Sequence, residues 1–224
     1  MADGPSLIKI NGNITKPIEV LINKISDAVG GIYKPYQIRR VAKAEADAAI
    51  IGAQAQIEVT NIQRRALTRF VSEEAKKQDN METITEKAIP YLIDTSTPQD
   101  MDNDWITNFF DKCRIVSDEE MQVLWAKVLS GEANSPGTYS KRTVNSLGSL
   151  DKVDAQLFIK LCGFNWLIDG ELKTLIYDEE DSIYKDQQIG FDMLNHLDDI
   201  GLISFEPGAG YKEVDLSQRI SISY

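Results

Sequence analysis

The chain has a single histidine, His196, among its 224 residues, and only two cysteines, Cys113 and Cys162. A zinc site of the usual ligand spacing, or a Ser-His-Asp triad with spare candidates, needs more of these residues than the chain supplies. Two isolated cysteines fit a reducing compartment, and both are expected to be buried small hydrophobes rather than reactive thiols. The sequence therefore predicts no catalytic residue, no metal site and no cofactor.

Long apolar runs are also lacking. Nowhere do about 18 apolar residues follow one another, as a membrane-spanning helix requires. The first residues show no basic stretch followed by an apolar one, which a secretory signal would need. With 42% hydrophobic and 26% charged residues, the composition is that of an ordinary globular protein. We therefore expect a cytoplasmic protein.

Acidic residues outnumber basic ones, 35 to 24, for a formal net charge of −11. This balance disfavours a protein that coats nucleic acid along its length. Residues 1–80 carry 12 Lys plus Arg against 9 Asp plus Glu, whereas residues 81–224 carry 12 against 26. Such an asymmetry indicates different partners for the two segments, or contact between them in an assembly. Two ordinary solvated surfaces are the open alternative.

An amphipathic helix is expected over residues 14–33. Its polar face carries charges of both signs, whereas a helix that lies on a membrane usually has a basic polar face. We therefore favour packing on a core or a partner helix over membrane docking. The apolar stripe, with steps of three and four residues, consists of Ile14, Ile18, Leu21, Ile22, Ile25, Val29 and Ile32.

A second, Ala-rich helix is expected from Ile38 to about Lys77, because no proline interrupts this stretch. Its apolar residues form a narrow seam that resembles a coiled-coil face. We interpret the helix as an oligomerisation spine, and the alternative is a helix packed within the monomer. The candidate interface residues are Ile51, Ala55, Val59, Ile62, Ala66 and Phe70. The candidate basic contacts, for phosphates, acidic lipid or an acidic neighbour, are Arg39, Arg40, Arg64 and Arg65.

The helical pattern breaks at residues 79–83, and a shorter helix is expected at 81–93. The loop at 94–98 then separates this helix from a stretch rich in aromatic residues. The expected domains are a helical N-terminal oligomerisation region, 1–80, and an acidic helical domain, 81–224.

Beyond residue 98 the pattern predicts compact helices around aromatic side chains. One helix presents a bulky apolar face of Trp105, Ile106, Phe109 and Phe110. The predicted helix ends are a capping box at Ser117-x-x-Glu120, a stop at Gly131, a start at Ser140, and a further start at Asp151 or Asp154.

The C-terminal part has a different pattern, in which Asp169-Gly170 is a strong hairpin signal. The order of its elements is typical of winged-helix domains. The predicted elements are strands at 164–168 and 172–177, a helix at 187–200, and a second hairpin with strands at 202–205 and 211–214.

The helix at 187–200 carries Asp192, Asp198 and Asp199 but no lysine or arginine. A helix that reads DNA carries basic or amide side chains toward bases and phosphates, so nucleic acid is disfavoured as a partner and protein contacts are favoured. The predicted fold class is mainly α. It has an amphipathic N-terminal helix, a long Ala-rich helix and a compact helical domain that ends in a small winged-helix-like α+β element.

Three segments resemble a known family: MQVLWAKVLSGE at 121–132, GTYSKRT at 137–143 and LGSLDKVDAQLF at 147–158. Together they resemble the bacterial domain of unknown function numbered 2806. A looser form of the LWAxxL block is similar to the abortive-infection alpha proteins linked to phage resistance. The resemblance implies a bacterial cytosolic protein and a component of phage defence. It implies no activity and no catalytic residue.

The residues of these motifs also have a structural interpretation. Trp125 is expected to be a core or interface anchor, and an ion pair between Arg142 and Glu132 would hold the loop between the first two of these segments. We favour this structural role over a ligand site. The motif residues to which we assign it are Leu124, Trp125, Gly131, Glu132, Ser140 and Arg142.

The leading hypothesis is a non-enzymatic protein that forms a homo-oligomer through the long helix and presents its acidic domain to a protein of unknown identity. One alternative is an effector at the membrane surface, peripheral to the inner membrane, which inserts residues 14–33. Another binds nucleic acid through the basic pairs. An enzyme would depend on His196, which shares a helix face with Asp192 and Asp199 at steps of four and three. We favour an exposed acidic face there.

Overall fold

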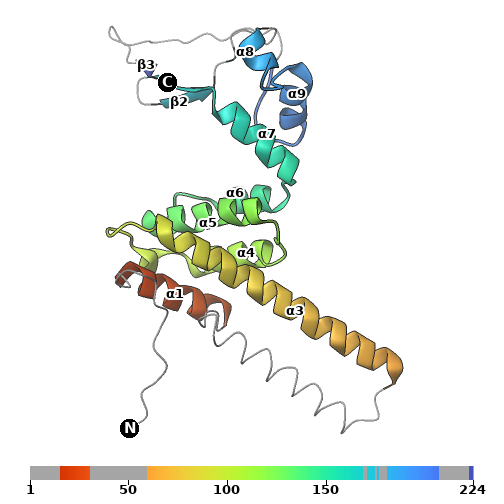
Figure 1. Cartoon of the computed structure of the whole chain (residues 1–224). Coiled ribbons are helices and arrows are strands. Elements are labelled where there is room, and N and C mark those ends of the chain that lie inside the picture. The colour runs from red at the N-terminus through yellow and green to blue at the C-terminus, as the bar shows by residue number, and fades with distance from the viewer. Residues whose placement is uncertain are drawn as a thin grey trace. The chain divides into compact units, whose positions relative to one another are not determined.

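The computed structural model describes residues 16–30, 60–168, 171–174, 176, 181–206 and 222–223. Contacts divide the chain into two units, Met1–Ser149 and Leu150–Tyr224. The described part is mainly helical, as the sequence predicts. The described helices of the first unit (Figure 1) are α1 (Lys16–Val29), α3 (Asn61–Ala88), α4 (Asn103–Cys113), α5 (Glu119–Asn134) and α6 (Lys141–Gly148), with single 3-10 turns η1 (Ile89–Tyr91) and η2 (Pro98–Asp100).

Helix α1 confirms the predicted amphipathic helix. Gly30 ends it with a φ of 79°, a backbone conformation that suits glycine. Its residues Ile18, Leu21 and Ile25 are buried, and it packs against α4 and η2. The apolar face of α1 is therefore part of the core of the first unit.

Helix α3 begins and ends elsewhere than predicted. Thr60 caps it through a capping box with Gln63, and its ψ of 155° is not helical. A continuous helix from 38 to 77 is therefore wrong at Thr60, while residues 38–59 lie outside the described part. The predicted break at 79–83 is also wrong, since α3 continues to Ala88.

The polar residues near position 80 face inward instead of ending the helix. Asn80 is only 5% exposed, and its Nδ2 donates to the backbone oxygen of Arg114 at 2.9 Å. This contact attaches α3 to the end of α4. The boundary expected between residues 80 and 81 thus falls in the interior of α3, whereas the contacts separate the chain after Ser149.

The core of the first unit is built on aromatic rings of α4 and α5. Trp105 stacks on Phe109 with ring centroids 5.1 Å apart, and Phe109 meets Trp125 edge to face at 5.1 Å. Such pairs stabilise a core by about 0.5–1.5 kcal/mol beyond their buried area. The predicted apolar face at 105–110 is confirmed.

Two predicted helix starts are confirmed and one is wrong. Ser140 caps α6, and its Oγ accepts from Thr143 N. Asp151 is the N-cap of α7. Helix α5 is capped by Asp118, whose carboxylate accepts from the backbone N–H groups of residues 120 and 121, and not by Ser117. Aspartate and serine are equally good N-caps, so the sequence alone could not decide whether Ser117 or Asp118 caps α5.

The second unit contains helices and a small antiparallel sheet in the strand order β2-β1-β3. The hairpin predicted around Asp169-Gly170 is confirmed, with Trp166 opposite Lys173. Its described elements are α7 (Lys152–Cys162), β1 (Asn165–Ile168), β2 (Glu171–Thr174), α8 (Ser182–Lys185), α9 (Phe191–Asp199) and β3 (Ile222–Ser223).

Two predictions for this unit are corrected by the structure. The helix expected at 187–200 is confined to α9, and a short helix, α8, precedes it. Residues 202–205 form no strand. Instead Leu202 N donates to Leu197 O at 2.9 Å, and Phe205 packs on the core beside α9. Residues 211–214, the other expected strand, lie outside the described part.

Replacing Leu21 by alanine tests whether α1 belongs to the core. Leu21 is fully buried, so Leu21→Ala is expected to lower the free energy of unfolding by about 2–5 kcal/mol, as measured in urea. The matched control is Asn23→Ala on the exposed face of the same helix, which is expected to change it by about 0.5 kcal/mol or less. Equal stability of the two variants would contradict the docking of α1.

Candidate functional site: the Glu132 loop and the exposed half of α3

The loop between α5 and α6 is held by one buried carboxylate. Glu132 is 2% exposed. Its Oε1 accepts from Gly137 N at 2.7 Å and its Oε2 from Tyr139 N at 2.8 Å. Both are charge-assisted hydrogen bonds, which are stronger than neutral ones. The predicted ion pair with Arg142 is wrong, because backbone N–H groups occupy both carboxylate oxygens and Arg142 is exposed.

Gly131 has a different role from the one predicted. It does not end the helix, since α5 continues to Asn134. A Cβ atom at position 131 would lie 2.7 Å from Cε2 of Tyr139, closer than carbon atoms pack. The glycine therefore allows the ring of Tyr139 to lie directly on α5.

The two tryptophans of this unit differ in their hydrogen bonding. Trp105 Nε1 donates to the backbone oxygen of Tyr139 at 2.7 Å, which adds a third attachment of the loop to the core. Trp125 is fully buried, as predicted, and its Nε1 has no hydrogen-bond partner among the described residues. The motif residues Glu132, Tyr139 and Ser140 thus meet at the loop, whereas Leu124 and Trp125 lie further back along α5.

A pocket of about 410 Å³ opens beside this loop. Most of its polar groups hold the protein itself together. Glu132 and Trp105 hold the loop, and Asp102 caps α4 by accepting from Trp105 N at 2.9 Å, a hydrogen bond that lowers the pKa of Asp102. The lining residues are Asp100, Asp102, Trp105, Glu132, Pro136, Gly137, Tyr139, Ser140 and Lys141. Asp102, Trp105 and Glu132 of the lining are therefore already engaged within the protein.

His196 has a partner that sequence reasoning missed. Its Nε2 lies 2.7 Å from Oδ1 of Asp154 on α7, while Asp199 accepts from Asn195. His196 and Asp154 are 42 positions apart in the sequence, so the spacing of residues along one helix could not reveal this pair. Among the residues described here, no cluster of three or more His, Cys, Asp or Glu side chains could hold a metal ion.

The two cysteines lie in different surroundings. Burial raises the pKa of the Cys113 thiol well above its ordinary value. Cys162 is half-buried, and burial raises its pKa as well. A raised pKa reduces the thiolate fraction, and the thiolate is the reactive form. Burial therefore lowers the thiolate fraction of both cysteines.

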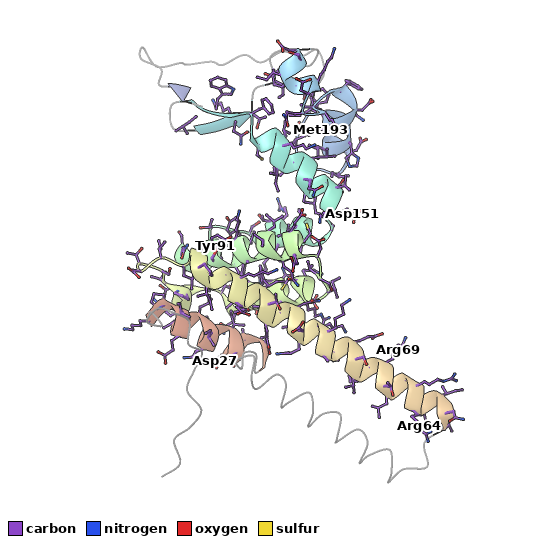
Figure 2. The ribbon with its side chains drawn as sticks, viewed as in Figure 1. Asp27, Arg64, Arg69, Tyr91, Asp151 and Met193 are labelled. Atoms are coloured by element: carbon purple, nitrogen blue, oxygen red, sulfur yellow. The ribbon has the colours of Figure 1, made fainter. Side chains whose placement is uncertain are left out.

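The first half of α3 is a second candidate site. Residues 61–76 are exposed, apart from the half-buried Val71, and we call them the exposed half of α3. Ile62 is 71% exposed and Phe70 60%. Figure 2 shows Arg64 and Arg69 on this segment, which extends beyond the other described helices of the unit. The candidates Arg39, Arg40, Ile51, Ala55 and Val59 lie outside the described part.

Residues 64–208 match the family described as "Protein of unknown function (DUF2806)". The chain belongs to this family. The match includes most of the exposed half of α3 and the Glu132 loop. Neither a curated protein nor a solved structure matches the chain. In the part of this DUF2806 chain that the structure describes, no helix has the length and apolar character needed to cross a membrane.

Replacing Glu132 by glutamine tests its role in the DUF2806 loop. Glutamine offers one acceptor oxygen, and its NH2 group would face a backbone N–H. We expect Glu132→Gln to lower the free energy of unfolding by about 1–3 kcal/mol in urea. The exposed Glu119, on the first turn of the same helix, is the control, and Glu119→Gln is expected to cost well under 1 kcal/mol. The structural role fails if the Glu132 variant is as stable as the control.

The effect of Gly131→Ala on the free energy of unfolding should depend on the residue at position 139, and its sign should reverse when Tyr139 is removed. In the native chain the new Cβ displaces Tyr139, so Gly131→Ala is destabilising. In a Tyr139→Ala background the collision is gone, and the higher helix propensity of alanine makes the same change stabilising by about 0.5–1 kcal/mol. A double-mutant cycle of thermal or urea unfolding measures this. An identical effect in both backgrounds would refute the close approach.

Proposed function

We propose that this DUF2806 protein is a non-enzymatic assembly component. The exposed half of α3 binds a second copy of the chain, and the acidic second unit binds another protein. The observation that carries the proposal is the exposure of Ile62 and Phe70 on a helix whose other half is packed in a core.

Energetics support an interface at this position. The buried residues of α3 begin at Asn80, so no side chain in the first half of the helix is buried against the described part of its own unit. Burying Ile62 or Phe70 fully would contribute roughly 1.5–3 kcal/mol each. Ala66 lies between them at steps of four, so the three side chains form one apolar stripe. On a helix segment that stayed in solvent, such an apolar stripe would bury no surface and contribute no stability.

The charge of the second unit supports a protein partner. Residues 150–224 contain 15 Asp plus Glu against 6 Lys plus Arg. On α9, Asp192 and Asp199 are exposed, and exposed carboxylates repel phosphates. The winged-helix-like interpretation of this unit remains part of the proposal, with α8 and α9 as the helix pair. In it, α9 presents carboxylates to a basic protein surface rather than to DNA.

The alternatives have less support. Insertion of α1 into a membrane would have to withdraw Leu21 and Ile25 from the core of the first unit. Glu73 and Glu74 on the same exposed segment offset part of the positive charge of Arg64 and Arg65 that would attract nucleic acid. The likeness to abortive-infection proteins assigns no role to any described residue, so the proposal does not depend on it.

Light scattering during size-exclusion chromatography tests self-assembly. The wild type is expected to elute as a discrete multiple of 25.1 kDa, and Phe70→Lys is expected to shift it toward the monomer, because a lysine there places a charge in the interface. The matched control is Thr68→Lys, an exposed residue on the opposite face of α3, which should leave the mass unchanged. A monomeric wild type at micromolar concentration would overturn the proposal. An absorbance ratio typical of nucleic acid would favour the alternative ligand.

A further inference from the structure

The geometry points to an antiparallel, two-fold symmetric pairing of the exposed halves of α3, in which Phe70 of each chain packs on Ala66 of the other. This inference rests on the self-assembly proposed above and adds the identity and orientation of the occupant. The occupant is a second copy of the same helix segment.

The first argument is the size of the side chains on the stripe. Phe70 is large and Ala66 is small, and both are exposed. In a parallel, in-register pair each Phe70 would meet the other Phe70, and each Ala66 the other Ala66. The two rings would crowd one another, whereas the two alanines would leave a gap between the helices. An antiparallel pair centred at residue 68 places a large side chain over a small one twice.

The second argument is the length of the exposed segment. It covers residues 61–76, so its middle lies at residue 68, the midpoint of Ala66 and Phe70. In the antiparallel pair, residue 61 of one helix lies level with residue 75 of the other. The described part of each partner helix thus ends before Asn80, where the packed part of α3 begins.

The third argument is the order of charges along the segment. Basic residues come first, at Arg64, Arg65 and Arg69, then Glu73 and Glu74 follow, and Lys76 is the last charged residue of the segment. An antiparallel pair brings the basic end of one helix beside the acidic residues of the other, whereas a parallel pair aligns like charges. The Arg69–Glu73 and Lys77–Glu74 pairs within the helix are exposed or partly so, and such pairs are weak. They can therefore exchange partners.

Cysteine cross-linking with a short bismaleimide tests the orientation. The full-length chain carries Cys162→Ala, because Cys162 is only half-buried, and keeps the buried Cys113. Three variants are made: Gln63→Cys, Glu74→Cys and both together. In the antiparallel pair, position 63 lies within one residue of the level of position 74 in the other chain. Like positions are ten and twelve residues apart, or about 15 and 18 Å.

The expected result is a cross-linked dimer from the double variant and from an equimolar mixture of the two single variants. Each single variant alone should give none. Thr68→Cys, on the face opposite the stripe, is the control for random collision and should also give none.

Light scattering measures the molar mass of the same samples, and this distinguishes failure of the self-assembly from failure of the antiparallel pairing. If all variants are monomers, both the self-assembly and the pairing are overturned. If the chain is a dimer but each single variant cross-links with itself, the pair is parallel and only this inference is overturned. A dimer in which no variant cross-links forms through another surface and overturns the pairing as well.

Discussion

The packing of α3 on α5 is the contact on which the rest of the first unit depends. It buries Ile84 and Ala88 together with a polar layer. In this layer Lys87 Nζ donates to Gln122 Oε1 at 2.9 Å, and Gln122 Nε2 donates to Asn80 Oδ1 at 3.4 Å. Buried hydrogen bonds of this kind are lost if one helix slides along the other, so they fix the register of α3. A fixed second half of α3 determines which residues of the first half are left in solvent.

The structure separates two kinds of motif residue in this DUF2806 chain. The loop residues around Glu132 contact one another. Their hydrogen-bonding groups bind other groups of the protein and hold α4, α5 and α6 together. In the part of the unit that the structure describes, Ile62 and Phe70 of the stripe on α3 stay largely exposed. The association proposed above draws on the second observation, because a helix held by a rigid body presents a defined surface to a partner.

Local rules predicted the elements whose signals are local. The apolar spacing of α1 and the cap at Ser140 needed no information from distant residues. The errors concern residues whose partners are distant. Asn80 looked like a helix break, because its partner, the backbone of Arg114, is 34 positions away. Gly131 looked like a helix stop, but its reason is the ring of Tyr139, and His196 meets Asp154 across 42 positions.

Hydrogen exchange of the backbone amides of α3, followed as the protein concentration is raised, tests the central claim most directly. An unsupported helix half frays and exchanges fast, whereas a paired one is protected. Protection of residues 61–76 should rise with concentration, while that of residues 80–88, which are packed on α5, stays constant and serves as the internal reference. Fast exchange of residues 61–76 at the highest concentration would contradict an interface on this helix.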